Sequence, residues 1–387
     1  MDFRLDDDQR RLQAALREFC DEQIAPHAEQ RDREGRFEDG LLPKLAAMGL
    51  FGMYVPSEYG GAGLDVVSYN LAVEELSRAC AATGILVSAH HSLCLDPILN
   101  FGSEAQKRKY LPKLASGEWI GCFSLSEPGS GSDAGAARCT ALERSDGWHI
   151  TGTKCFVTNG LEAHVVVLFA ASEPQQARHR VSAFIVDRDM PGWRIGKVEK
   201  KLGIRASSTT ELVFEDCVVP KESLLGERAR GLRVALATLD GGRIGVAAQA
   251  VGISQAALEA SLAYSKTRQA FGQPICEFQA IQWKLADMQA GILAARLLTW
   301  RGAWLKQNGR PYATEAAMAK VFASELSSRV TNMAIQVLGG YGYVCDYPVE
   351  RYLRDAKITE LYEGTSEIQR LVIARRVIRD AEYVRRT

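Results

Sequence analysis

Three glutamates stand close together near the end of the sequence, in the stretch ELYEGTSEIQ at residues 360–369. A glutamate carboxylate can act as a general base when a pocket aims it at an acidic proton. Glu360, Glu363 and Glu367 are spaced i, i+3 and i+7, so a continuous helix would place all three on one face. A solvated acidic stripe is the plainer interpretation of that spacing. The spacing alone therefore leaves both interpretations open.

A glycine within the same stretch argues against a continuous helix, because glycine disfavours helix interiors. Ser366, followed three residues later by Gln369 and an apolar run, fits a capping box. This pattern predicts a helix that begins at Ser366, with that serine as its N-cap. Glu363 would then lie on the preceding loop, where Gly364 leaves the backbone unhindered. Such a loop could aim the carboxylate into a pocket.

A second stretch that could bind a ligand is the glycine-rich PGSGSDAG at residues 128–135. A dinucleotide-binding fingerprint needs a strand before it, a helix after it and an acidic residue about 20 positions further on. The next segment, RCTALERSDGWHI, instead has the pattern of a strand and a hairpin, so that fingerprint is disfavoured. Two interpretations remain. The stretch is either a plain turn-rich connection, or a loop whose N–H groups and hydroxyls (Ser126, Ser130, Ser132) line a polar ligand.

Composition argues against several classes of function. The 387 residues include 47 Lys and Arg and 47 Asp and Glu, and this balance argues against nucleic acid or an anionic membrane as the main partner. The cysteines are scattered without a C-x-x-C pair, and the histidines lack metal-ligand spacing, so we predict no metal site. The N-terminal MDFRLDDDQRRL has no apolar leader core, and no segment has the uncharged length of a membrane span. We therefore expect a cytoplasmic protein without a membrane span.

The elements that must position these residues fall into three regions. Helical periodicity dominates as far as Trp119, short β-rich runs occupy about residues 121–226, and long helical patterns return from about residue 231. Asp146-Gly147 between two alternating runs predicts a β-hairpin. We expect an α+β fold with domains at residues 1–119, 120–228 and 229–387.

Seven blocks of sequence, in order and spread along the chain, carry a specific family resemblance. They are CFSLSEPGSGSD (122–133), GTKCFVTNG (152–160), KLGIRASSTTELVFEDCVVP (201–220), TLDGGRIGVAAQAVG (238–252), TRQAFGQPI (267–275), QVLGGYGY (336–343) and ELYEGTSEIQRLVIA (360–374). Together they resemble the acyl-CoA dehydrogenases, most of all the short-chain (butyryl-CoA) branch. The resemblance implies an N-terminal α-helical domain, a middle β-barrel or sandwich domain and a C-terminal four-helix bundle. It also implies an FAD enzyme that converts a saturated acyl-CoA to the trans-2-enoyl-CoA.

The resemblance assigns the FAD site to several of these blocks. The glycine-rich loop would embrace the flavin ring, and Phe156 would form a second wall, where many relatives carry tryptophan. Thr158 would bond near flavin N5, and Arg268 would reach the pyrophosphate of the FAD in a neighbouring subunit. The implied FAD contacts are Phe123, Leu125, Ser126, Gly131, Ser132, Phe156, Val157, Thr158, Arg268, Phe271, Gln279, Gln336, Val337, Gly339, Gly340, Thr365, Ser366 and Glu367.

Glu363 matches the general base of the family. By resemblance it would remove the α-proton while hydride leaves the β-carbon for flavin N5 on the opposite face. The thioester oxygen would be bound by a flavin ribityl hydroxyl and by the Glu363 backbone N–H. Some relatives place the base where this chain has Gly242, which cannot act as one. The implied substrate contacts are Ser132, Asp240, Arg243, Tyr362 and Gly364.

One region bears on the length of the acyl group. Residues 84–99, GILVSAHHSLCLDPIL, resemble the same region of the short-chain branch. Glutaryl-CoA dehydrogenases carry an arginine in this part of the chain, whereas none occurs here from Ala79 to Lys107. A dicarboxylate substrate is therefore disfavoured. Because pocket depth sets chain length, we expect first a straight chain of about four to six carbons and second a short 2-methyl-branched chain.

The resemblance also implies two partners. Electrons would pass to an electron-transferring flavoprotein, and a shared FAD site implies a homotetramer built as a dimer of dimers. Two other classes remain open. One is an acyl-CoA oxidase or flavin monooxygenase on the same scaffold, and the other is a non-catalytic module that binds acyl-CoA or a flavoprotein.

Overall fold

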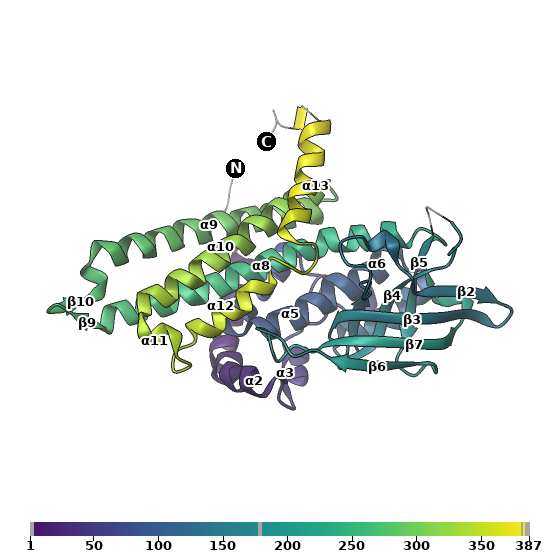
Figure 1. Ribbon diagram of the computed structural model, residues 1–387, viewed down its shortest axis with the longest axis horizontal. Helices are drawn as coiled ribbons and strands as arrows, with labels where there is room; N and C mark the ends of the chain where they lie inside the picture. Colours follow the sequence, from purple (N-terminus) through teal and green to yellow (C-terminus); the bar gives the residue numbers. More distant parts are fainter. Residues whose placement is uncertain (1–3, 177–179, 381, 384–387) are drawn as a thin grey trace.

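A computed structural model describes residues 4–176, 180–380 and 382–383, and it places helices at one end of the molecule and a β-sheet at the other (Figure 1). Long C-terminal helices lie above the N-terminal helices in this view, and both groups meet the sheet. The predicted order of helices, strands and helices is confirmed. The exact domain boundaries stay predictions.

The N-terminal helices surround a core segment that is buried on every side. They are α1 (Asp7–Phe19), α2 (Ala28–Glu34), α3 (Leu41–Ala47), α4 (Val66–Ala79), α5 (Ala81–Ala89), α6 (Asp96–Phe101) and α7 (Glu104–Ala115). Every residue of α5 is buried, and the helix continues into a wide π-helical turn at His90–Leu95. Such turns often occur near functional sites, because they change which side chains face inward.

Eight of the described strands pair into one mixed sheet, which forms the predicted middle β domain. They are β1 (Ile120–Ser124), β2 (Thr140–Arg144), β3 (Gly147–Thr158), β4 (Ala163–Ala171), β5 (Val181–Asp187), β6 (Trp193–Val198), β7 (Thr209–Val219) and β8 (Leu224–Leu225). The order is β6-β7-β3-β2-β4-β5-β8, with β1 pairing parallel to β4. The predicted hairpin is confirmed, since Arg144 of β2 pairs with Gly147 of β3, but its two-residue loop is Ser145-Asp146, one residue earlier than the predicted Asp146-Gly147.

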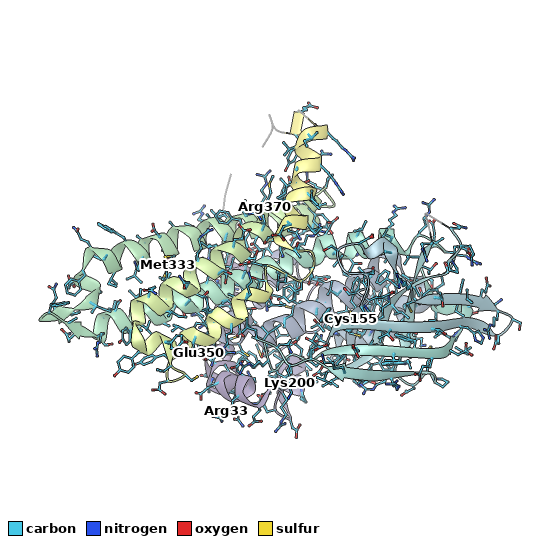
Figure 2. All side chains as sticks on the ribbon, in the orientation of Figure 1. Arg33, Cys155, Lys200, Met333, Glu350 and Arg370 are labelled. Atoms are coloured by element: carbon cyan, nitrogen blue, oxygen red, sulfur yellow. The ribbon has the colours of Figure 1, made fainter. Side chains whose placement is uncertain are left out.

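The C-terminal region is a bundle of long helices. Its elements are α8 (Gly231–Thr267), β9 (Gln269–Ala270), β10 (Gln273–Pro274), α9 (Gln279–Gln307), α10 (Ala313–Leu338), α11 (Gly340–Tyr343), α12 (Val349–Ile358) and α13 (Ser366–Arg379). The last helix, α13, projects away from the bundle, and Figure 2 labels Arg370 on it. Among the described residues, no helix combines the length and the apolar character that a membrane crossing requires.

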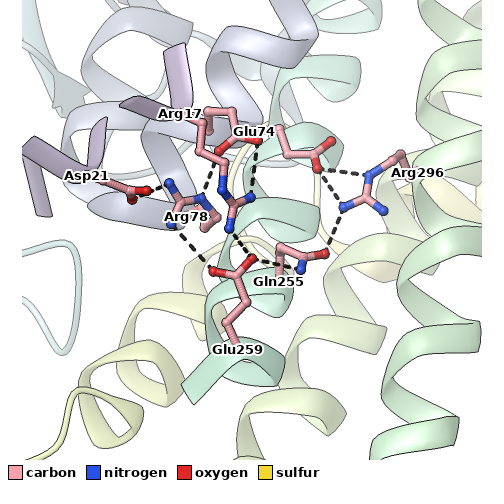
Figure 3. Close-up of polar contacts among 8 residues, drawn as sticks. Arg17, Asp21, Glu74, Arg78, Gln255, Glu259 and Arg296 are labelled. Atoms are coloured by element: carbon pink, nitrogen blue, oxygen red, sulfur yellow. Dashed lines mark hydrogen bonds and ion pairs between the residues drawn. The ribbon is translucent and has the colours of Figure 1, made fainter. Parts of the chain in front are cut away.

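A network of ion pairs fixes the N-terminal helices against α8 and α9 (Figure 3). Arg78 of α4 pairs with Asp21 at 2.6 Å and with Glu259 of α8 at 3.5 Å. Arg296 of α9 contacts Glu74 of α4 at 2.7 Å. Because Arg78 and Glu74 are buried, removing one partner would leave a buried charge uncompensated. The network therefore holds α4 in register against the two long helices.

The start of α13 corrects one prediction. The helix begins at Ser366 as expected, but its N-cap is Thr365, whose hydroxyl accepts a hydrogen bond from the Ile368 N–H at 3.4 Å. The side chain of Gln369 does not return to the cap. It donates instead to the carbonyls of Glu363 and Gly364 at 3.2 and 2.7 Å. The predicted capping box was wrong because the preceding turn recruits this glutamine.

Candidate active site

Glu363 lies on the turn between α12 and α13, in a backbone conformation that L-residues rarely adopt. Its φ is +53° and that of Gly364 is +94°, so two consecutive residues are left-handed. Such a conformation costs free energy in a non-glycine residue and persists only where the surroundings hold it. Here Lys320 of α10 donates from Nζ to the Gly364 carbonyl at 2.8 Å, beside the Gln369 amide. The turn is thus fixed from two sides.

The Glu363 carboxylate is buried against a glycine of α8. A Cβ built on Gly242 would lie only 1.9 Å from Glu363 Oε2, so a glycine at this position makes room for the carboxylate. Both carboxylate oxygens are buried, and neither has a hydrogen-bond partner among the described residues. Most buried polar atoms are paired, so two unpaired oxygens on one buried carboxylate call for an explanation such as a catalytic role.

Burial also sets the acidity of this carboxyl group. It raises the pKa of Glu363 to about 7, while the charges of Lys320 and Arg243 act in the opposite direction. Burial disfavours the ionised form of a carboxyl group, and nearby cations restore part of it. A carboxyl group with a pKa near the working pH is suited to accept a proton from a weak carbon acid.

Beyond Gly242, the face of α8 that meets Glu363 carries Gly245 and then Gln249; this face is called the α8 wall below. One turn on, a Cβ built on Gly245 would lie 2.4 Å from Ser88 Oγ, so the helix packs closely on α5 here. Two turns on, Gln249 accepts a hydrogen bond from the Tyr362 hydroxyl and donates to the Ala81 carbonyl at 3.1 Å. Seven residues of α-helix separate Gly242 from Gln249, a rise of about 10 Å. The polar pair of Gln249 and Tyr362 closes this wall.

A buried ion pair anchors the glycine-rich loop. Lys154 of β3 is fully buried and donates to Glu127 Oε1 at 2.7 Å and to the Leu125 carbonyl at 2.9 Å. The Glu127 carboxylate also accepts from the backbone N–H groups of Arg138 and Cys139 at 2.7 and 3.1 Å. Both ends of the loop are therefore tied to one carboxylate. The loop leads into β2, which confirms the strand predicted after it.

An exposed aromatic side chain stands beside this loop. Phe156 is 68% exposed and has a φ of +56°, at a point where the pairing of β3 with β7 shifts register. Its neighbours Cys155 and Val157 are buried, and Figure 2 places Cys155 at the end of β3 nearest the helices. The Cys155 N–H donates to the Ser126 carbonyl at 2.9 Å, which joins strand and loop. The two predicted flavin walls are thus adjacent.

Phe123 has a different environment from the one its place in the motif suggests. Its ring packs on Phe169 with centroids 4.8 Å apart, against the core that also contacts Tyr362. Its side chain therefore contributes to the core, and its backbone is what the loop can offer to a ligand.

A second group of predicted cofactor residues lies far from the glycine-rich loop and Phe156 within one chain. Arg268, Phe271 and Gln279 surround the β9–β10 hairpin, which Figure 1 shows at the end of the molecule opposite the sheet. Phe271 is 97% exposed. Gln336, Val337, Gly339 and Gly340 end α10 and begin α11, with open space where a Cβ would stand on either glycine. Arg268 faces the ring of Tyr341 at 5.7 Å and forms no ion pair within the described part of the chain.

The other predicted contacts lie near the turn of Glu363 or at the loop. Asp240 and Arg243 form an ion pair one turn apart on α8, and the Arg243 Nε is buried without a partner among the described residues. Tyr362 and Gly364 flank Glu363, and Thr365, Ser366 and Glu367 follow it into α13, where Ser366 is buried and Glu367 exposed. On the other side, Gly131 and Ser132 are exposed on the glycine-rich loop, and Thr158 ends β3.

Comparison with known proteins identifies the family. Family models described as the N-terminal, middle and C-terminal domains of acyl-CoA dehydrogenase match residues 6–118, 122–217 and 229–378. The short-chain specific acyl-CoA dehydrogenase of Mus musculus is 52% identical over 368 residues, which cover 95% of this chain and 89% of the mouse protein. The chain belongs to the acyl-CoA dehydrogenase family.

Solved structures of acyl-CoA dehydrogenase relatives agree with this assignment. Butyryl-CoA dehydrogenase from Megasphaera elsdenii has a TM-score of 0.96 and 46% identity, covering 98% of this chain and all of that one. A chain from a structure of the electron transferring flavoprotein of Acidaminococcus fermentans has a TM-score of 0.97 and 50% identity, covering 98% of this chain and all of that one. The predicted family, three-domain fold, enzyme class and FAD cofactor are confirmed.

The residues present fit FAD. Phe156 and Phe271 are both exposed aromatic side chains and offer flat apolar surfaces. The glycines at residues 339 and 340 allow a close approach to the backbone. Arg268, which forms no ion pair with any carboxylate that the structure describes, suits a pyrophosphate. Because these features lie at opposite ends of one chain, a single cofactor would meet both groups only if two chains contribute.

The sequence pattern did not single out Lys320 or Gln249, and it named Gly242 only as a position where some relatives carry the base. All three residues contribute through contacts between helices, which spacing does not reveal. Lys320 did leave a signal, because it is the one charged residue in the small apolar run AAMAKVFAS. A lone lysine on the buried face of a helix calls for a partner in the core.

Proposed function

We propose that this acyl-CoA dehydrogenase removes the α-proton and the β-hydride of a short-chain acyl-CoA and releases the trans-2-enoyl-CoA. The observation that carries this proposal is the Glu363 carboxylate, buried, without a hydrogen-bond partner among the described residues and seated against Gly242. A carboxylate that only stabilised the fold would be paired. An unpaired one, with its pKa raised to about 7, is suited to proton transfer.

Several groups of this chain would act during the reaction. Glu363 would accept the α-proton at a carboxylate oxygen. Its backbone N–H donates to no acceptor among the described residues, so it is available to the thioester oxygen, where negative charge develops. Bound FAD would supply the acceptor for the hydride. The glycine-rich loop, Phe156 and Thr158 would hold the flavin, and residues 268–279 and 336–340 would hold the remainder of a cofactor shared with a second chain.

The preference for a short acyl chain is supported by the polar pair that closes the α8 wall. Gln249 and Tyr362 stand about 10 Å along the helix from the glycine that faces the base. A longer chain would have to displace this hydrogen-bonded pair and bury its polar atoms unpaired, which costs about 1–3 kcal/mol per group. The short-chain name of the mouse relative agrees with this limit.

The proposed partners follow from the same observations. A homotetramer, built from dimers that share FAD, would bring the exposed Phe271 and Arg268 of one chain to the loop of another. The likeness to a chain solved with an electron transferring flavoprotein supports such a protein as electron acceptor. A stable, FAD-loaded monomer in a native mass measurement would contradict the shared site. A cytoplasmic location stays a prediction.

An anaerobic titration of the purified protein with acyl-CoAs tests the proposal. Butyryl-CoA should bleach the flavin band, and glutaryl-CoA should leave it oxidised. A flavin that stays oxidised with butyryl, hexanoyl and 2-methylbutyryl-CoA would refute the proposed function. Rapid peroxide release in air would favour the oxidase alternative, and a colourless protein that FAD cannot reconstitute would favour a binding module.

A further inference from the structure

Lys320 is a buried lysine without an ion pair. It lies on α10, its side chain is fully buried, and it forms no ion pair with any described carboxylate. The other fully buried lysine, Lys154, pairs directly with Glu127 at 2.7 Å. Burying an ammonium without a contacting carboxylate is costly, and an apolar residue among the neighbouring alanines of α10 would pack without that cost. Packing alone therefore does not explain this lysine.

The only hydrogen bond that the Lys320 ammonium forms within the described chain reaches the turn of Glu363. Its Nζ donates to the Gly364 carbonyl at 2.8 Å. The same carbonyl accepts from Gln369 Nε2 at 2.7 Å, so two donors hold one oxygen. The carbonyl belongs to the second of two consecutive left-handed residues. A relaxed turn would withdraw this oxygen and change the direction in which Glu363 points.

We propose that Lys320 is a positioning residue for proton abstraction, which anchors the turn that aims Glu363 and supplies the positive charge that keeps its carboxylate ionised. This inference rests on the proposed role of Glu363 as the base. Lys320 itself does not touch the reacting atoms in this account, because it acts through the Gly364 carbonyl and through its charge.

The electrostatic part involves groups on four elements. Lys320 on α10 and Arg243 on α8 both lower the pKa of Glu363, and Lys320 is the larger influence. Burial lowers the pKa of Lys320 itself to about 8. The charge of Arg243 on α8 acts in the same direction, whereas those of Glu363 and Glu360 on the turn and Glu367 on α13 oppose it. Without the lysine, only Arg243 would oppose the burial of Glu363. A larger fraction of the carboxyl groups would then be protonated at neutral pH.

The test is an infrared difference titration of the Glu363 carboxyl group in the FAD-loaded protein. The carboxyl band that the Glu363→Gln variant lacks identifies the residue. Lys320→Met should raise the pKa of that band by about one unit or more, since a nearby opposite charge shifts a carboxyl pKa by about 1–3 units. Flavin reduction by butyryl-CoA should slow, with its pH profile shifted to higher pH by the same amount.

Two further variants separate anchoring from charge and control for general effects. Lys320→Gln keeps an amide donor for the Gly364 carbonyl and loses the charge, so the pKa of Glu363 should rise while the turn is kept. It also carries the test if Lys320→Met fails to fold. Lys357→Met removes an exposed lysine that pairs with Glu360 at 2.7 Å, and it should leave the pKa of Glu363 unchanged.

The outcomes distinguish this inference from the proposed function. A folded Lys320→Met or Lys320→Gln protein with an unchanged carboxyl pKa and an unchanged pH profile would overturn the role of Lys320. A uniform loss of rate at every pH, with no shift of the band, would show a structural role only and would also overturn it. Normal flavin reduction in Glu363→Gln would instead overturn Glu363 as the base, whatever the infrared titration shows.

Discussion

Replacing Gly242 by alanine should impair catalysis while leaving the fold intact. A Cβ at this position would lie 1.9 Å from Glu363 Oε2 and 2.9 Å from its Cδ, and real Cβ contacts essentially never fall below 3.0 Å. The carboxylate would therefore have to retreat by about 1 Å. A misplacement of about 1 Å at a reacting group can cost about 10²-fold in rate.

The free energy of unfolding should respond differently from the rate. The clashing atoms belong to the end of a flexible side chain, which can rotate away at little cost. Alanine in a helix interior also gains about 1 kcal/mol over glycine in helix propensity. The variant should consequently be as stable as the parent protein or slightly more stable, and it should keep its FAD.

Stopped-flow reduction of the flavin by butyryl-CoA measures the rate, and thermal unfolding measures the stability. Gly302→Ala is a matched control, because the nearest atom to its new Cβ would be Ile244 Cγ1 at 3.5 Å, an ordinary contact. It should behave as the parent protein. A Gly242→Ala protein that is reduced at the parental rate would refute the placement of the carboxylate against α8.

Three further predictions follow from the same site. The pKa of Glu363 is raised to about 7 in the folded protein, so its burial destabilises the fold only at a pH where the carboxyl group of the unfolded chain is ionised. Glu363→Gln should therefore raise the free energy of unfolding by about 3 kcal/mol above pH 7 and by almost nothing below pH 4.5. Equal effects of this change on unfolding at pH 8 and at pH 4 would contradict the prediction. Gln249→Ala should open the end of the α8 wall and raise the rate with octanoyl-CoA relative to butyryl-CoA, whereas an unchanged ratio in flavin-reduction assays would show that chain length is set elsewhere. Lys154→Met should leave the buried Glu127 carboxylate without its cationic partner, which should lower the free energy of unfolding by about 3–5 kcal/mol and release most of the bound FAD. Adding Glu127→Gln to this variant should restore part of the stability. No loss of stability in the single variant would refute the anchoring role of the pair.

Local patterns predicted the elements of this fold well. The two-residue hairpin, the helix that begins at Ser366 and the loop position of Glu363 all depend on short-range chemistry. The structure has all three, with the hairpin loop displaced by one residue to Ser145-Asp146. The N-cap of α13 was misplaced by one residue, because the Gln369 side chain donates to the carbonyls of Glu363 and Gly364 in the preceding turn. A capping pattern fails where other nearby carbonyls compete for the same side chain.

The arrangement of the site was less accessible to sequence reasoning. The Glu363 carboxylate packs against Gly242 because α8 passes the turn of Glu363, and Lys320 reaches that turn from a third helix. No spacing rule brings residues 242, 320 and 363 together. The collinear family motifs supplied the proposed base and the proposed cofactor residues, but they did not indicate that Lys320 would donate to the carbonyl beside that base.

The most direct test of the central claim compares Glu363→Gln with Glu360→Gln in anaerobic reduction by butyryl-CoA, each variant fully loaded with FAD. Glu360 lies three residues earlier, where Lys357 and Ser328 already bond to its carboxylate. Loss of a general base lowers a rate by about 10²–10⁴-fold, so Glu363→Gln should bleach its flavin that much more slowly, while Glu360→Gln keeps close to the parental rate. Parental bleaching by Glu363→Gln would contradict the assignment of Glu363 as the base.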